Sequence, residues 1–342
     1  IICGSGNNAG EGYLFAQLAI EQGYNIQIVT LAKNNESIET QKAKKQLPIE
    51  KNIKISSKLS ALKDPCDLII DALLGIGISR DLSKDYLKAV SLINKNPSPV
   101  LSIDIPSGLN ANTGNIMRNA IKANHTITFI AHKQGLMTGK AKDYIGQLIL
   151  SDLGSIQFQS KITATKHFIT SIKLHSRSKI AHKGCFGHVL SIGGDHHYAG
   201  AAQLAAIAAI RTGAGLVSLA TKKSYSKTSH IVHPEIMAYA IKTENEIKKI
   251  MDKASVLIIG PGLGQSIWSK KIWDSIKESD KPKIIDADGL NLLAKNPQYS
   301  NNWILTPHPG EAARLLGKTI HEIESDRFKS VALLQEKYNA VV

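Results

Sequence analysis

The chain has 342 residues, 43% hydrophobic and 20% charged, a composition that suits about two globular domains of roughly 150 residues each. Its formal net charge of +14 is spread along the chain, and 36 of the 42 basic residues are lysine. Because arginine is the residue that reads base edges, this dispersed lysine argues against nucleic-acid binding.

The sequence also argues against membrane and secreted classes. No run of about 18 uninterrupted apolar residues predicts a membrane span, and no signal-peptide pattern is visible. The three cysteines, Cys3, Cys66 and Cys185, have no CxxC spacing and cannot frame a disulfide scaffold, so we expect a cytoplasmic protein. The chain opens without Met inside a strand pattern, Ile1–Cys3, so we expect further residues upstream.

Short β-branched runs alternate with helical patterns in the first half, which predicts parallel α/β architecture. The predicted strands are Ile1–Cys3, Ile26–Leu31, Leu68–Ile70, Val100–Ile103 and Thr126–Ile130. Tyr13–Gln22 is predicted to be an amphipathic helix that ends at Gly23. Its predicted inward residues are Leu14, Phe15, Leu18 and Ala19.

The same alternation continues in the second half. The predicted strands are Val189–Ile192, Leu216–Ala220, Val256–Ile259, Lys283–Ile285 and Ile304–Leu305, and Ala199–Arg211 is a predicted helix. The stretch Ser155–Ser178 is polar and has no clear helical period, so we place a domain boundary there. The predicted domains are residues 1–160 and 161–342.

Gly-rich and polar clusters directly follow the predicted strands, where open parallel sheets bind ligands. Gly4–Gly12 joins the first strand to the first helix and suits an anion at a helix N-terminus. A standard NAD site would have an acidic residue at the end of the second strand, but Leu31–Asn35 has none. A tight turn without a ligand remains the alternative.

Asp71 and Asp104 end two further predicted strands. With Asn8 they form three polar strand ends in one predicted sheet, although each Asp alone could be a cap or a turn former. Hard oxygen ligands of this kind suit an alkali or alkaline-earth cation rather than zinc. No HExxH, G-x-S-x-G or Walker A spacing supports a metalloprotease, an α/β-hydrolase or a P-loop protein.

Similar clusters follow the strands of the second half. They are Gly193–Ala202, Gly260–Gly264, Asp286–Asp288 and Thr306–Glu311, the last of which opens a helix with Pro and Glu in its first turn. Three glycines within Gly260–Gly264 imply close approach of the backbone to a neighbour or ligand. His308 alone could be a surface histidine, and we expect the adjacent His196 and His197 to lie in a solvated loop.

Taken together, these motifs resemble the bifunctional NAD(P)H-hydrate repair enzymes over nearly the whole chain. GSGNNAGEG (4–12), DIPSGLNANTG (104–114) and the segment Phe129–Gly154 are similar to the epimerase domain of that family. The later clusters are similar to its dehydratase domain. The resemblance implies a Rossmann-like parallel-sheet domain followed by a ribokinase-like α/β domain, both incomplete at the chain ends.

For the first half, the resemblance implies epimerisation of the R and S forms of hydrated NADH and NADPH at C6, with Asp104 as the acid/base group. It places potassium at Asn8, Asp71 and Ser107, and substrate at Asn7, Asn8, Ala9, Gly10, Glu11, Gly75, Ile76, Gly77, Ile78, Ser79, Arg80, Asp81 and Asp104. The family usually has GNNGGDG, so Ala9 and Glu11 are departures that put substrate binding in question.

For the second half, the resemblance implies dehydration of S-NAD(P)HX with ADP or ATP as phosphoryl donor, with or without magnesium. It places the hydrate at Ala201, Ala202, Gly262, Gly264 and His308. The family continues beyond the position of Val342 to a nucleotide loop and a catalytic Asp, so we expect those parts downstream.

Two other functions remain as alternatives. One is a non-catalytic nucleotide-binding or interaction protein on the same folds, and the other is a ribokinase-like kinase of a small molecule. We expect small-molecule substrates, no nucleic-acid or membrane partner, and a homo-oligomer.

Overall fold

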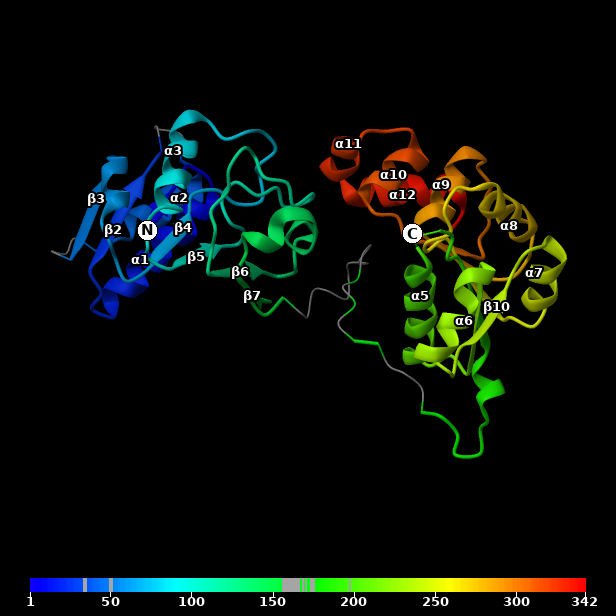
Figure 1. Ribbon diagram of the computed structural model, residues 1–342. Helices are drawn as coiled ribbons and strands as arrows, with labels where there is room; N and C mark the ends of the chain where they lie inside the picture. The colour runs from blue at the N-terminus through cyan, green and yellow to red at the C-terminus, as the bar shows by residue number, and fades with distance from the viewer. Residues whose placement is uncertain are drawn as a thin grey trace. The chain divides into compact units, whose positions relative to one another are not determined.

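The computed structural model describes residues 1–32, 36–48, 52–155, 167, 169, 171–172, 176–196 and 198–342, except the side chains of residues 228–232. It divides into two compact units, Ile1–Phe168 and Ile169–Val342 (Figure 1). Among the described residues, no helix is both long enough and apolar enough to cross a membrane.

The first unit contains a seven-stranded parallel sheet in the order β3-β2-β1-β4-β5-β6-β7. Its strands are β1 (Ile2–Cys3), β2 (Ile26–Thr30), β3 (Ile53–Ser56), β4 (Ile69–Ala72), β5 (Val100–Ile103), β6 (His125–Phe129) and β7 (Gln147–Ser151). The parallel α/β prediction is therefore confirmed for this half. The sequence prediction missed the two edge strands, β3 and β7, because both are short and partly exposed and mix polar with apolar residues.

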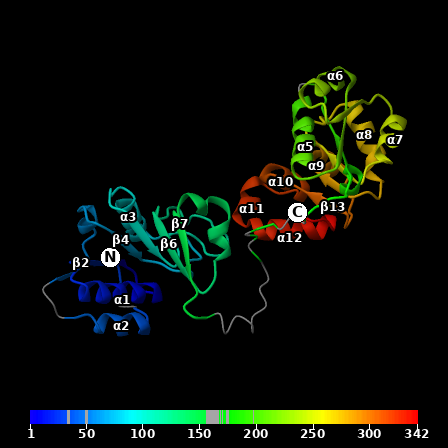
Figure 2. The same ribbon diagram turned by 90° about the horizontal axis from the view of Figure 1, so that it is seen from below.

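Helices cover both faces of this sheet (Figure 2). They are α1 (Asn7–Glu21), α2 (Ile38–Lys45) and α3 (Lys84–Ile93), with short 3-10 helices at Leu59–Lys63, Gln134–Met137 and Gly139–Asp143. Consecutive residues of a strand pack into the cores on opposite faces of the sheet. Ile70 packs with residues of α1, whereas Ile69 packs with residues of α3. This alternation is why the central strands read as continuous apolar runs.

Helix α1 differs from the prediction in its start and in its buried face. It begins at Asn7, six residues before the predicted start, so the conspicuous Asn/Gly segment is the first turn of the helix. Leu14 and Leu18, predicted to face inward, are 45% and 62% exposed. The buried stripe consists of Ala9, Tyr13, Ala16 and Ile20. Small residues here let the helix lie so close to the sheet that a Cβ at Gly12 would meet Ala72 Cβ at 2.6 Å.

The second unit contains a six-stranded parallel sheet in the order β10-β9-β8-β11-β12-β13. Its strands are β8 (His188–Ile192), β9 (Leu216–Thr221), β10 (Met237–Ala240), β11 (Val256–Ile259), β12 (Lys283–Ile285) and β13 (Trp303–Leu305). The prediction missed the edge strand β10, whose sequence Met-Ala-Tyr-Ala has no β-branched residue.

The helices of this unit are α5 (Ala199–Arg211), α6 (Lys223–Val232), α7 (Glu244–Met251), α8 (Ile267–Lys277), α9 (Ala287–Lys295), α10 (Pro309–Leu316), α11 (Ile320–Ser325) and α12 (Arg327–Tyr338), with a 3-10 helix at Lys183–Phe186. The predicted bounds of α5 are confirmed. Helices α7 to α12 contribute to one core together with Leu190 and Ile259, whereas α5 packs in a second core with Val217 and Leu219.

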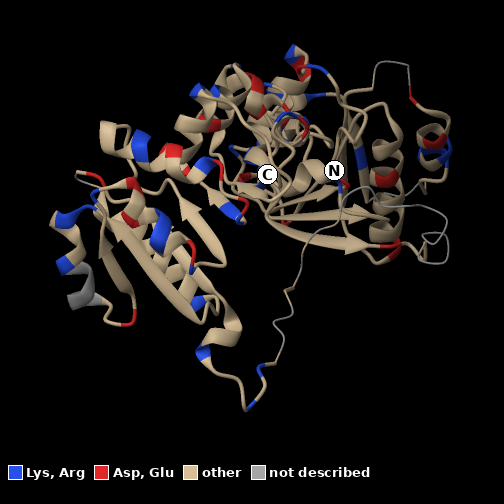
Figure 3. Cartoon of the chain, turned by 90° about the vertical axis from the view of Figure 1, so that its right-hand side faces the viewer, with Lys and Arg blue, Asp and Glu red and all other residues tan. Residues whose placement is uncertain are grey.

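Charged residues of both signs are interspersed over the helices of both units (Figure 3). This mixture agrees with the spread of charge along the sequence.

Two residues of α1 provide a matched test of its corrected buried face. Ile20 is 4% exposed, so we expect Ile20→Ala to lower the free energy of unfolding by about 2–5 kcal/mol. Leu18 is 62% exposed, so we expect Leu18→Ala to change it by no more than about 0.5 kcal/mol. Urea unfolding, monitored by circular dichroism, measures both free energies. A larger loss of stability in Leu18→Ala than in Ile20→Ala would show that α1 buries the face predicted from the sequence.

Candidate functional sites

The first candidate site lies where the strand order of the first sheet reverses, between β1 and β4. These strands pair in register, with Ile2 opposite Asp71, and the chain leaves them in two loops that run side by side. A Cβ at Gly4 would lie 2.0 Å from the Leu73 carbonyl oxygen, so only glycine fits at this crossing. Ligands of open α/β sheets bind at such reversals, outside the carboxyl ends of the strands.

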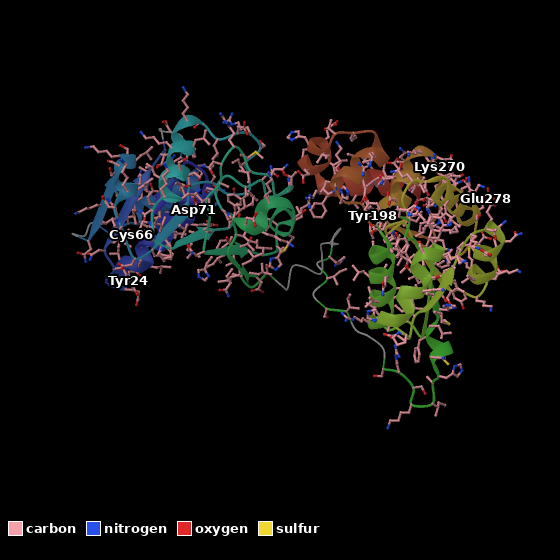
Figure 4. All side chains as sticks on the ribbon, in the orientation of Figure 1. Tyr24, Cys66, Asp71, Tyr198, Lys270 and Glu278 are labelled. Atoms are coloured by element: carbon pink, nitrogen blue, oxygen red, sulfur yellow. The ribbon has the colours of Figure 1, made fainter. Side chains whose placement is uncertain are left out.

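Asp71 is fully buried at the end of β4 (Figure 4). Its Oδ1 accepts hydrogen bonds from Ser107 Oγ at 2.6 Å and Leu73 N at 3.2 Å, and its Oδ2 accepts from Ser102 Oγ and Ser107 N, both at 2.8 Å. Burial raises the pKa of Asp71, although these hydrogen bonds oppose the shift. Each donor is neutral, and no ion pair between Asp71 and a cationic side chain is present among the described residues.

Asn8 and Ser107 meet at the Leu74 backbone, and Ser107 in turn donates to Asp71. Asn8 Nδ2 donates to the Leu74 carbonyl at 2.9 Å, and Ser107 Oγ lies 2.8 Å from Leu74 N and 3.2 Å from its carbonyl oxygen. The Oδ1 of Asn8 is buried and has no hydrogen-bond partner. The structure thus brings the three predicted potassium ligands together. A buried oxygen without a donor, beside a carboxylate without a counter-charge, fits a hard cation.

Asp104 ends β5 in a tight, strained turn. Its φ is +66°, and Ile105 N donates to the Ile103 carbonyl at 2.8 Å across it, which makes a γ-turn. Lys133 Nζ lies 2.6 Å from Asp104 Oδ1, and Thr128 Oγ1 lies 3.4 Å from the same oxygen. A candidate acid/base carboxylate is thereby held in one ion pair at the edge of the same sheet.

Glu11 lies on the second turn of α1, and its side chain reaches solvent. Burial by the surrounding protein and the charge of Asp104 raise the pKa of Glu11 to about 7, while Lys133 acts in the opposite direction. Glu11 therefore changes charge near neutral pH.

The other predicted substrate residues of this half fall into buried and exposed groups. Ala9 is 1% exposed and its methyl group packs in the α1 core, so the departure from glycine there is absorbed by the core. Gly10 is buried beside Thr40, whereas Asn7 is exposed. The exposed members of the predicted loop are Ile76, Gly77, Ser79, Arg80 and Asp81, and its partly buried members are Gly75 and Ile78.

The second candidate site lies at the corresponding reversal of the second sheet, between β8 and β11. The Gly262 carbonyl accepts hydrogen bonds from Gly194 N and Asp195 N, both at 2.8 Å. A Cβ at Gly193 would lie 2.1 Å from the Pro261 carbonyl oxygen, which again requires glycine at the crossing. The predicted residue Gly262 is thus a central contact between the two loops.

Asp195 links these loops to two other elements. It is 5% exposed, ion-paired with Lys222 just after β9, and accepts hydrogen bonds from Ser269 Oγ at 3.1 Å and from His196 N at 2.6 Å. Burial alone would raise the pKa of Asp195, but the hydrogen bond from Lys222 and those from neighbouring donors lower it to about 2. Asp195 therefore remains a carboxylate, and the protein supplies its counter-charge.

The remaining predicted residues of this half lie around the same edge. Gly264 N donates to Asp288 Oδ2 at 2.8 Å, and the Ala202 side chain is buried whereas Ala201 is exposed. His308 follows β13 and caps α10: its Nδ1 accepts from Gly310 N at 2.9 Å and its own N donates to Glu311 Oε2 at 3.0 Å. Its side chain is 62% exposed, so it can cap the helix and still face a ligand. His197 lies outside the described residues.

Sequence reasoning missed Lys133, Lys222 and the pairing role of Asp195. Lys222 lies two residues after the predicted strand Leu216–Ala220, and Lys133 lies three residues after Thr126–Ile130. The rule that polar residues after strands meet at one edge would have selected them had it been extended from acidic and amide residues to lysine.

Each unit matches a different known family. Residues 1–135 match the family described as YjeF-related protein N-terminus. Residues 189–342 match the family described as NAD(P)H-hydrate dehydratase. Each match spans the sheet reversal and the polar loops of one unit.

Similar proteins extend over the whole chain. The bifunctional NAD(P)H-hydrate repair enzyme Nnr of Coxiella burnetii is 41% identical over 100% of this chain and 71% of its own length. The enzyme of the same name from Escherichia coli is 39% identical over 100% of this chain and 67% of its own length. A solved ADP/ATP-dependent NAD(P)H-hydrate dehydratase from Bacillus subtilis, co-crystallised with ATP and Mg²⁺, is 30% identical, with a TM-score of 0.43 over 48% of this chain and 59% of that one.

The raised pKa of Glu11 predicts a pH dependence of stability. Between its ordinary pKa of 4.5 and the folded value of about 7, the folded state holds a proton that the unfolded chain has released. Stability falls with pH wherever the folded state binds more protons, so Glu11 removes stability as pH rises through this window. We expect Glu11→Gln to unfold at a higher urea concentration than the unaltered chain at about pH 8 and at a similar concentration at about pH 5. An equal difference at both pH values would contradict this.

Proposed function

This chain belongs to the bifunctional NAD(P)H-hydrate repair enzyme family, and we propose that it repairs hydrated NADH and NADPH at two sites, one in each unit. The first unit interconverts the R and S hydrates at C6. The second converts the S hydrate back to NADH or NADPH at the expense of ADP or ATP. The observation that supports this proposal is the contact of Asn8 and Ser107 through the Leu74 backbone, and of Ser107 with Asp71, at the reversal of the first sheet. The corresponding contact in the second sheet joins Gly262 to the Gly194 and Asp195 backbone.

Asp104 is the acid/base group of the epimerase site in this proposal. Epimerisation requires a bond at C6 to break and to re-form on the other face. As the C6 hydroxyl proton leaves, the C6–N1 bond would open to an aldehyde with its electron pair on N1, and the proton would return to the oxygen when the ring closes. The Asp104 carboxylate ends β5 beside the Asn8, Asp71 and Ser107 cluster, where it can accept that proton and give it back. The nucleotide would lie along the first turns of α1 and the loop Gly75–Asp81, as the resemblance implies.

Potassium fits the cluster of Asn8, Asp71 and Ser107. Asn8 Oδ1 has no donor, and Asp71 is buried with neutral partners, so both gain from a cation. Such an ion would supply fixed positive charge beside the substrate and compensate the Asp71 carboxylate. Asn8, Asp71 and Ser107 themselves hold the loops after β1, β4 and β5 in one place.

The second site is proposed for dehydration of the S hydrate. Ala201, Ala202, Gly262, Gly264 and His308 would line the hydrate pocket. ADP or ATP, with magnesium on its phosphates, would transfer a phosphoryl group to the C6 oxygen as the hydroxyl proton leaves. Departure of phosphate with loss of a proton from C5 then restores the ring double bond.

The alternatives explain less of the structure. A non-catalytic binding protein gives no reason for a strained carboxylate that is ion-paired to Lys133, whose side chain is 18% exposed. A small-molecule kinase would account for the second unit alone. All three cysteines are free, which agrees with the proposed cytoplasmic setting. We further propose that the protein is a homo-oligomer and has no nucleic-acid or membrane partner.

Asp104→Asn tests the epimerase proposal. Asparagine tolerates the same left-handed backbone, so the substitution removes the charge while the turn is kept. We expect the rate of epimerisation of R-NADHX to fall by about 10²–10⁴-fold while substrate binding remains. Chromatographic separation of the two hydrates measures this rate. Asp67→Asn, at an exposed position before β4, is the matched control and should react normally. Normal turnover by Asp104→Asn would remove Asp104 from the chemistry.

The potassium assignment predicts ion-dependent epimerisation. We expect activity in potassium chloride and a marked loss in tetramethylammonium chloride, because a bulky organic cation cannot enter the cluster. Asn8→Ala removes the unpaired oxygen and should weaken the apparent affinity for potassium, and Asp71→Ala should abolish the ion dependence. Equal rates in the two salts would show that these residues hold no potassium.

A further inference from the structure

Lys133 connects the ends of two neighbouring strands in the first unit. Its Nζ lies 2.6 Å from Asp104 Oδ1, after β5, and donates to the Phe129 carbonyl, at the end of β6, at 2.8 Å. The Lys133 and Asp104 side chains are only 18% and 14% exposed. This ion pair is therefore largely shielded from water, and salt screens it less than a fully exposed pair.

Both strand ends that Lys133 joins are strained. Asp104 has φ +66°, and Ile130 has φ +67° with Ala131 N donating to the Phe129 carbonyl at 2.7 Å, so each strand ends in a γ-turn. A β-branched residue such as Ile130 rarely adopts a positive φ. Residues held in this way cluster at functional sites, and the surroundings must over-determine them.

The backbone beyond Lys133 is fixed as well. Gly135 N donates to the Ala111 carbonyl at 2.7 Å, and a Cβ at Gly135 would lie 2.4 Å from the Asn110 carbonyl oxygen. Lys133 thus projects from a segment packed against the chain that follows Asp104. Its ammonium has a defined place from which to orient the carboxylate.

We propose that Lys133 is the positioning residue that holds the Asp104 carboxylate in its reactive orientation for epimerisation. This inference rests on the proposed role of Asp104 and adds a residue to that site. Lys133 anchors one oxygen, Oδ1, so that Oδ2 is the oxygen left to exchange the proton with substrate. Thr128 Oγ1, 3.4 Å from Oδ1, lies on the same side of the carboxylate.

Lys133→Met tests this role, since it keeps the length of the side chain and removes the ammonium. A carboxylate displaced by about 1 Å can cost about 100-fold in rate, so we expect kcat for epimerisation to fall by about 10–100-fold with KM changed by less than about 3-fold. Lys133→Arg keeps the charge and should recover a large part of kcat. Lys122→Met is the matched control, because Lys122 lies over the Tyr144 ring in the same unit, 5.9 Å from its centroid. It should retain normal kcat.

A double-mutant cycle separates positioning from a structural role. If Lys133 acts through Asp104, adding Lys133→Met to Asp104→Asn should lower kcat by less than about 2-fold beyond Asp104→Asn alone. If Lys133 merely holds its own loop, the two losses will multiply, and the proposal fails. Wild-type kcat in Lys133→Met together with a large loss in Asp104→Asn would overturn this inference alone. Wild-type kcat in Asp104→Asn would instead overturn the proposed function of Asp104.

A second readout is independent of turnover. Lys133 lowers the pKa of Glu11, which is about 7. Its removal should therefore raise the pKa of Glu11, as followed by carbon NMR of the Glu11 carboxyl in the full chain. Lys122→Met should leave that pKa unchanged. An unchanged Glu11 pKa in folded Lys133→Met would show that the ammonium does not act within the site.

Discussion

Two close crossings of the backbone, one in each sheet, hold together the loops that carry the candidate sites. At each crossing the loops that leave two adjacent parallel strands pass so closely that a Cβ at Gly4 or Gly193 would lie 2.0 or 2.1 Å from a carbonyl oxygen. The strand order reverses at each crossing, between β1 and β4 and between β8 and β11, so the helices that follow these strands cover opposite faces of the sheet. Polar groups that follow these strands have one edge of the sheet in common.

The two units solve the same electrostatic problem in different ways. Each places a buried carboxylate at its reversal, Asp71 in the first and Asp195 in the second. Asp71 has neutral donors and a raised pKa, whereas Asp195 is paired with Lys222 and has a pKa of about 2. Burying a charge without a partner costs free energy. Binding of an external cation would therefore stabilise the Asp71 carboxylate in the first unit, whereas in the second unit Lys222 already neutralises Asp195. This contrast gives a physical reason to propose potassium in one unit alone.

The sequence predicted the centre of each fold better than its margins. Central strands such as β4 and β11 are apolar runs because helices cover both of their faces, and such runs are visible without a structure. The edge strands β3, β7 and β10 carry polar or weakly β-forming residues and were missed. The face of α1 was misassigned because Ala9, Gly12 and Ala16 approach the sheet through their small size, which a count of leucines does not reveal.

The candidate site shows the same limit. Asn8, Asp71 and Asp104 could be predicted because a strand-end rule needs only local sequence. The pairs Lys133–Asp104 and Lys222–Asp195 join residues far apart in the chain, so their existence depends on sheet order and register. Tertiary placement also decides the consequence of the two departures from the family pattern. The methyl group of Ala9 is taken up by the core, whereas Glu11 stays at the rim of the site with a pKa of about 7.

The strained turn at Asp104 explains why positioning has to come from outside the residue. The positive φ turns the chain directly after β5, and Asp is among the few residues that tolerate this backbone. The turn fixes the Cα–Cβ direction but leaves rotation of the carboxylate free. Lys133, held by the Phe129 carbonyl at the end of β6, removes that freedom. Two neighbouring strands thus fix one carboxylate: β5 fixes its direction and β6, through Lys133, fixes its orientation.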